Sequence, residues 1–177
     1  DGLLNGWARH LNVDLMEETL GNIPGDFLNV GFLMLKPFSL MIDKYVNFWD
    51  SMDNPRNVES FLRMERWIFD SPDQAGSAYA KFIRDLYQGN KLVGGELEIN
   101  GRKVDLKNIV QPVLNIYAEQ DHLVPPSSTK PLEQYVGSKD ITTTAFPVGH
   151  IGLYVSSKTQ RDLAPLVAKW LWKKSGS

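Results

Sequence analysis

The run Val113-Leu-Asn-Ile-Tyr-Ala118 is rich in β-prone residues, and after two intervening residues the chain enters Asp121-His-Leu-Val-Pro-Pro126. A second such run, Ile141-Thr-Thr-Thr-Ala-Phe146, leads directly into Pro147-Val-Gly-His150. Each run is predicted to be a strand whose end releases an ionisable side chain into a turn, an aspartate after the first and a histidine after the second. Their separation, 150 − 121 = 29 residues, leaves room for a helix and a return strand between them.

The chain from residue 96 onward alternates strand signals with helix signals. Asn100-Gly101, within the β-prone segment 96–106, predicts a hairpin with a type I′ turn. A helix that begins around residues 127–128 is expected to run to Tyr135, and a terminal helix is expected to follow the second strand. One apolar face of that terminal helix comprises Leu163, Leu166, Val167, Trp170 and Leu171. This alternation predicts an α/β fold with a parallel sheet, whose functional sites lie at the carboxyl ends of the strands.

Helical signals dominate residues 1–95, which are rich in aromatic and methionine side chains. Helices are expected over residues 15–20, 27–35 and 38–48, and side chains at helical spacing predict a further helix. Those side chains are Val58, Phe61, Leu62, Glu65 and Ile68. Ser71-Pro72 is predicted to begin the next helix. One face of that helix carries a stripe of apolar side chains from Ala75 to Leu86. These stripes are interpreted as packing surfaces.

The order aspartate then histidine is that of the acid and the base in an α/β-hydrolase triad, where the nucleophile precedes both. Asp121 and His150 are therefore the candidate acid and base. The sequence contains neither a G-x-S-x-G motif nor a cysteine, so we expect the nucleophile upstream of residue 1 in a longer chain. Ser77 lies in Ala75-Gly-Ser-Ala78, which lacks the second glycine of an elbow, and it is interpreted as a small helix residue.

Composition excludes several other classes of protein. The 177 residues are 42% hydrophobic with a net charge of −2, enough to bury a core but without the basic surface of a nucleic-acid-binding protein. No apolar run is long enough for a membrane span, and the first residues lack the zones of a secretion signal. The three histidines show no metal-ligand spacing, so neither a metal ion nor a cofactor is expected. His10 is interpreted as a surface or packing residue.

Four longer motifs carry a resemblance to a known family. Ile116-Tyr-Ala-Glu-Gln-Asp-His-Leu-Val-Pro-Pro126 and Phe146-Pro-Val-Gly-His-Ile-Gly152 look like the Asp and His motifs of the polyhydroxyalkanoate synthases. Leu62-Arg-Met-Glu-Arg-Trp-Ile-Phe-Asp-Ser-Pro-Asp73 and Gly31-Phe-Leu-Met-Leu-Lys-Pro37 resemble the short-chain, two-component class III enzymes in particular. The resemblance covers nearly the whole chain.

The resemblance implies an α/β-hydrolase core interrupted by a helical cap, with residues 1–95 as the cap and residues 96–177 as the C-terminal part of the core. It implies an acyltransferase that polymerises 3-hydroxyacyl-coenzyme A, such as 3-hydroxybutyryl-coenzyme A, and releases coenzyme A, which is part of the substrate and no cofactor. The nucleophile would be an upstream cysteine in a G-x-C-x-G elbow, acting with Asp121 and His150. A homodimer through the cap, a second synthase subunit and a cytoplasmic location at the surface of polymer granules are also implied.

Three alternatives stay open at this point. Asp121 either orients His150 or helps to deprotonate the attacking hydroxyl, and the second role is favoured because a cysteine ionises more easily than an alcohol. His122 either fixes the turn at Asp121 or is an exposed turn residue. A serine esterase or thioesterase of the same fold would use the same pair with an upstream serine, whereas a non-catalytic interaction fragment would use neither side chain for chemistry.

Overall fold

The computed structural model describes residues 3–35, 38 and 42–176. The chain divides into two units, His10–Arg84 and a second unit composed of Asp1–Arg9 with Asp85–Ser177. The first unit is helical and the second combines helices with strands, so the predicted mixed α/β class is confirmed. The finer expectation of a cap at residues 1–95 and an α/β-hydrolase core at residues 96–177 stays a prediction.

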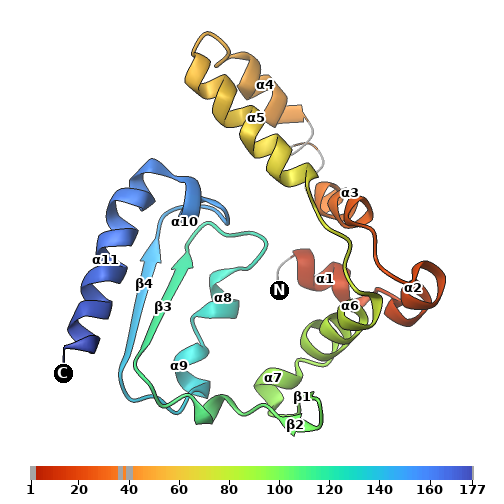
Figure 1. Ribbon diagram of the computed structural model, residues 1–177, viewed down its shortest axis with the longest axis vertical. Coiled ribbons are helices and arrows are strands. Elements are labelled where there is room, and N and C mark those ends of the chain that lie inside the picture. The colour runs from red at the N-terminus through yellow and green to blue at the C-terminus, as the bar shows by residue number, and fades with distance from the viewer. Residues whose placement is uncertain (1–2, 36–37, 39–41, 177) are drawn as a thin grey trace. The chain divides into compact units, whose positions relative to one another are not determined.

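The helical unit is built from short helices that pack in pairs. They are α2 (Val13–Leu20), α3 (Gly25–Leu35), α4 (Lys44–Trp49), α5 (Pro55–Phe69) and α6 (Gly76–Phe82). Helix α2 packs against α6, whereas α3 and α4 both contact α5 (Figure 1). The helices predicted at residues 15–20, 27–35 and around 58–68 are confirmed. The helix predicted over residues 38–48 corresponds in part to α4, and residues 39–41 lie outside the described residues.

The predicted helix start at Ser71-Pro72 is wrong, because long-range partners hold this segment in an extended conformation. The Ser71 hydroxyl lies 3.0 Å from Asn29 Oδ1 and 3.1 Å from the Ile68 carbonyl oxygen, so it does not cap a following helix. Gln74 pairs with Ile23 through two backbone hydrogen bonds of 2.8 and 2.9 Å. Helix α6 therefore begins only at Gly76.

The capping pattern expected at Ser71 is found instead at α5. The Asn54 side chain accepts a hydrogen bond from the backbone N–H of Arg56 at 3.0 Å, and Pro55 occupies the first helical turn. Proline is well placed there because its missing N–H would have no partner within the helix.

A polar cluster around Glu65 joins α4 to α5. The Tyr45 hydroxyl donates to Glu65 Oε2 at 2.8 Å, and Lys44 forms an ion pair with the same carboxylate. The hydrogen bond to Glu65, followed by desolvation and the negative charge of Glu65, raises the pKa of Tyr45. Phe48 and Phe61 stack beside this cluster with ring centroids 3.8 Å apart.

The second unit begins with helices and a small hairpin. Its first elements are α1 (Leu3–Arg9), the later residues of the π-helical turn η2 (Ile83–Gln88), α7 (Lys91–Gly94), β1 (Glu98–Ile99), β2 (Arg102–Lys103) and the 3-10 turn η3 (Leu106–Asn108). Asn100 and Gly101 both have positive φ angles, 50° and 71°, between antiparallel β1 and β2. The predicted type I′ hairpin is therefore confirmed, with shorter strands than expected.

Two parallel strands form the centre of the second unit, and both match the predicted residues. Strands β3 (Val113–Ala118) and β4 (Ile141–Phe146) pair in parallel from Val113 opposite Ile141 to Ala118 opposite Phe146. The connection contains α8 (Pro126–Thr129) and α9 (Leu132–Tyr135), and α10 (Gly152–Val155) and α11 (Ser157–Ser175) follow β4 (Figure 1). The indole N–H of Trp170 on α11 donates to the Thr142 hydroxyl on β4 at 3.3 Å.

Two predicted helices differ from the observed ones. The helix expected to run from residues 127–128 to Tyr135 is divided into α8 and α9 at Lys130-Pro131. Pro131 lacks the N–H that would continue the hydrogen-bonding ladder of α8. The stripe expected from Ala75 to Leu86 begins in α6 but ends in η2, where the helix widens.

In the described part of the chain, no helix has both the length and the apolar character needed to cross a bilayer.

Gly76 of α6 lies so close to the backbone of Gly21 that there is no space for a side chain. A Cβ atom on Gly76 would lie 1.8 Å from the Gly21 carbonyl oxygen, whereas a Cβ atom on Gly6 in α1 would meet nothing within 4 Å. We expect Gly76→Ala to reduce the free energy of unfolding of the full-length protein by about 1–3 kcal/mol or more, because the backbone must shift. Gly6→Ala should leave it unchanged or raise it by up to about 1 kcal/mol, since alanine favours helix. Urea denaturation followed by circular dichroism measures both, and equal midpoints would contradict the packing described.

Candidate active site

The carboxyl ends of β3 and β4 bring the two predicted site residues to one edge of the sheet. Asp121 follows Ala118 by three residues and His150 follows Phe146 by four, and these two strand ends lie opposite each other. Backbone hydrogen bonds continue beyond the strands. Glu119 N–H donates to the Phe146 carbonyl at 2.8 Å, and Gln120 N–H donates to the Val148 carbonyl at 3.0 Å. The two turns are therefore connected directly.

Asp121 and His150 form a hydrogen-bonded pair across this edge. His150 Nδ1 lies 2.7 Å from Asp121 Oδ2, and the two side chains are 41% and 8% exposed, respectively. A buried acid thus holds one side of an imidazole that is open to solvent. The predicted side chains are brought together, although they are 29 positions apart in the chain.

The second oxygen of Asp121 is held by its own turn. Asp121 Oδ1 accepts hydrogen bonds from the backbone N–H groups of Leu123 and Val124, each at 2.9 Å. The carboxylate therefore cannot rotate without breaking two hydrogen bonds, and Oδ2 stays directed at His150. Aspartate in a turn commonly bonds the backbone N–H two residues later, so the position of Asp121 in a turn already favours this pattern.

The geometry suits the imidazole to act as a base. When Nδ1–H donates to a carboxylate, the neutral ring presents the lone pair of Nε2 on its opposite side. That nitrogen can accept a proton from a thiol or a hydroxyl, and the adjacent carboxylate stabilises the resulting imidazolium. The pair can therefore perform general acid and base catalysis for a nucleophile that approaches the exposed side of His150.

The other candidate residues differ from the pair in position or in burial. His122 is exposed beside the buried Asp121, so the neighbouring side chains differ in burial. His10 is also exposed. Ser77 is an exposed residue of α6 in the helical unit. Whether His122 supports the turn at Asp121 stays open.

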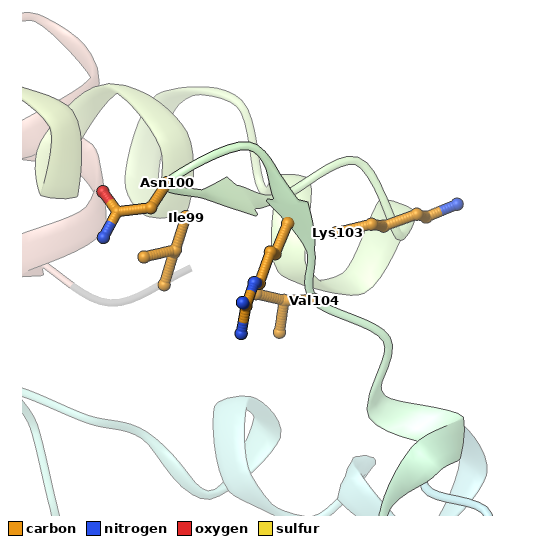
Figure 2. Close-up of a pocket in the computed structure, with 5 residues that line it drawn as sticks. Ile99, Asn100, Lys103 and Val104 are labelled. Carbon is orange, nitrogen blue, oxygen red and sulfur yellow. The ribbon is translucent and has the colours of Figure 1, made fainter.

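Two hollows lie away from the pair. One, of about 510 Å³, is lined by Ile99, Asn100, Arg102, Lys103 and Val104 of the hairpin. Figure 2 shows Ile99 and Val104 on one side of the hairpin, with Lys103 extending away from them. The other, of about 490 Å³, lies between α4 and α5 and includes Phe48, Phe61 and Glu65. Neither hollow is lined by Asp121 or His150.

Comparison with known proteins shows that this chain is similar to proteins named as polymerase subunits. Its relatives include the poly(3-hydroxyalkanoate) polymerase subunit PhaC of Allochromatium vinosum, 53% identical over 171 residues, which are 97% of this chain and 48% of the relative. The subunit of the same name from Thiocystis violacea is 51% identical over 173 residues, or 98% of this chain and 49% of the relative. That of Synechocystis sp. is 54% identical over 165 residues, or 93% and 44%.

The chain spans about half the length of these curated relatives. The similarity agrees with the resemblance to polyhydroxyalkanoate synthases that the motifs carry. A family model described as "Protein of unknown function (DUF3141)" matches residues 1–169, almost the whole chain. The chain therefore belongs to the family described as Protein of unknown function (DUF3141).

Proposed function

We propose that this chain is the cap and the C-terminal part of the catalytic core of an acyltransferase that polymerises 3-hydroxyacyl-coenzyme A into polyhydroxyalkanoate. The observation that carries the proposal is the 2.7 Å hydrogen bond between His150 Nδ1 and Asp121 Oδ2. The pair lies at the ends of two parallel strands, the usual place for a catalytic site in an α/β sheet. The name of the relatives that cover 97% and 98% of this chain supplies the reaction class.

The nucleophile in this proposal is a cysteine on a part of the full-length enzyme outside these 177 residues, which contain none. His150 Nε2 removes the thiol proton, because the thiolate is the reactive form. The thiolate adds to the thioester carbonyl carbon of 3-hydroxyacyl-coenzyme A, and the bond from that carbon to the sulfur of coenzyme A breaks. Coenzyme A leaves with the proton returned by the imidazolium, and the acyl group stays on the cysteine.

Chain growth requires a second proton transfer. A hydroxyl of the growing polyester or of the next monomer loses its proton to the base, and its oxygen attacks the acyl carbon. The bond from that carbon to cysteine breaks, and the thiolate is regenerated. The hydrogen bond to His150 supports the orienting role of Asp121, but an aspartate that holds the imidazole can also promote deprotonation of the incoming hydroxyl.

The proposed assembly involves the helical unit. Its described residues include exposed large aromatic side chains, among them Trp49 at 73% and Trp67 at 61% exposure. Tryptophan is enriched at protein interfaces, so these side chains support a homodimer through the cap, contact with a second synthase subunit, or attachment to polymer granules in the cytoplasm. A short-chain substrate such as 3-hydroxybutyryl-coenzyme A is proposed from the resemblance to the class III enzymes.

The 177-residue chain by itself is expected to form no acyl-enzyme and no polymer from 3-hydroxybutyryl-coenzyme A, because it has no cysteine to attack the thioester. Coenzyme A release, measured with a thiol reagent beside the full-length enzyme, tests this. Polymer formed with coenzyme A release, in material free of full-length enzyme, contradicts it.

Replacing the base tests the role of His150 directly. In the full-length enzyme, His150→Gln should lower the rate of single-turnover acylation by roughly 10²–10⁴-fold, the usual contribution of a general base. His10→Gln is the matched control, because His10 is an exposed histidine of the helical unit. A His150→Gln enzyme that polymerises within a few fold of the parent rate would remove His150 from the mechanism.

Asp121→Asn separates the two roles of the acid, because asparagine keeps the shape but loses the charge that supports an imidazolium. If Asp121 mainly serves His150, single-turnover coenzyme A release and steady-state polymer formation should slow together. If it mainly activates the incoming hydroxyl, acylation should stay fast while elongation fails. Asp162→Asn, at an exposed position of α11, is the control. Parent rates in both assays would show that Asp121 is not catalytic.

A further inference from the structure

We infer that Gly152 is a positioning residue for His150, and that it acts through its contact with Val148. The inference rests on the proposed function only in taking His150 as the base. Gly152 does not itself touch the reacting atoms. It determines where the turn that carries His150 can lie.

Val148 connects the turn after β4 to the turn after β3. Its N–H donates to the Phe146 carbonyl at 2.8 Å, and its own carbonyl accepts from Gln120 N–H at 3.0 Å. Gln120 immediately precedes Asp121, so the backbone of Val148 is held to the segment that carries the acid. A displacement of Val148 would therefore break a hydrogen bond beside Asp121.

Gly152 closes the histidine turn against this fixed residue. Its N–H donates to the Gly149 carbonyl at 2.9 Å, which brackets His150 within one turn. A Cβ atom on Gly152 would lie 2.8 Å from Val148 Cβ and 3.4 and 3.6 Å from its two methyl carbons. The nearest of these atoms is the branch point of the side chain, which cannot rotate away, so the turn itself would have to move.

Gly149 provides an internal comparison, although it lies directly beside His150. A Cβ atom there would lie 3.9 Å from the Gln120 carbonyl oxygen, an ordinary van der Waals contact. Neither Gly149 nor Gly152 is among the described residues with positive φ, so left-handed backbone explains neither glycine. The close approach to Val148 is therefore what distinguishes Gly152.

A methyl group at Gly152 would shift His150 relative to Asp121 and lengthen the 2.7 Å bond between them. Misplacement of a reacting group by about 1 Å can cost on the order of 10²-fold in rate. Removing the Val148 side chain should restore the space and part of the rate.

The test compares four variants of the full-length enzyme: Gly152→Ala, Gly149→Ala, Val148→Gly and the double variant Val148→Gly with Gly152→Ala. We expect Gly152→Ala to lower single-turnover coenzyme A release by roughly 10²-fold, with KM for 3-hydroxybutyryl-coenzyme A changed by only a few fold. Gly149→Ala should stay within about threefold of the parent. The double variant should release coenzyme A at least about tenfold faster than Gly152→Ala in a single turnover. The effects of the two substitutions would then be coupled rather than additive.

A spectroscopic measurement reports the pair independently of turnover. In protein labelled with ¹⁵N-histidine, an imidazole N–H bonded to a carboxylate gives a strongly downfield proton resonance. The parent and Gly149→Ala should show the His150 resonance, Gly152→Ala should lose or shift it, and the double variant should regain it. If Gly152→Ala does not fold, the double variant must fold and show the resonance, or the inference is wrong.

Other outcomes separate this inference from the proposed function. Equal losses in Gly149→Ala and Gly152→Ala, or no recovery in the double variant, would overturn the role of the Val148 contact. If His150→Gln loses activity while Gly152→Ala keeps the activity of the parent, the positioning role of Gly152 is overturned and the proposed function stands. Parent activity in His150→Gln, together with a lost resonance in Gly152→Ala, would overturn the proposed function alone.

Discussion

The in-register parallel pairing of β3 with β4 is the constraint on which the rest of the site depends. Because Ala118 lies opposite Phe146, the acid and the base leave the sheet at one edge. A slip of one residue would move one turn by about 3.3 Å along the strand and reverse the faces of its side chains. A hydrogen bond of 2.7 Å between Asp121 and His150 would not survive that shift. The register therefore decides whether the two residues form a site at all.

The Asp121 carboxylate is held by two sets of hydrogen bonds, one from its own turn and one from a residue distant in the chain. Oδ1 of Asp121 is bound by backbone N–H groups of its own turn, whereas Oδ2 is bound by a side chain from beyond the next strand. The local bonds orient the carboxylate, and burial keeps water from competing for it. His150 is more exposed than its partner, so a group from outside the pair can reach it. A fixed acid and an accessible base suit the proposed reaction, in which substrate and nucleophile both reach His150 from outside the pair.

Local signals in the sequence predicted the strands, the hairpin and the location of Asp121 and His150 at strand ends. The runs at residues 113–118 and 141–146 are dense in β-prone side chains, and Asn100-Gly101 tolerates the positive φ angles that its turn requires. The misplaced helix start at Ser71 has tertiary causes, whereas the division of a predicted helix at Pro131 has a local one. The Ser71 hydroxyl bonds to Asn29, 42 positions earlier in the chain, instead of capping a helix, and Gln74 is held extended by Ile23. The contact of Gly152 with Val148 is local to the turn after β4, but it depends on the exact backbone path of that turn, which the residue types alone do not specify.

The connection between the two strands also links chemistry to folding. Asp121 and His150, 29 positions apart in the chain, can form their hydrogen bond only after the segment between them has closed into a loop, a step that costs loop-closure entropy. Opening of β4 from β3 would separate acid from base even while the helical unit stayed intact. Local opening of this kind has its own free energy, which can be much smaller than that of global unfolding. Amide hydrogen exchange along β4 would thus report the opening equilibrium of β4, which also determines how long His150 stays paired with Asp121.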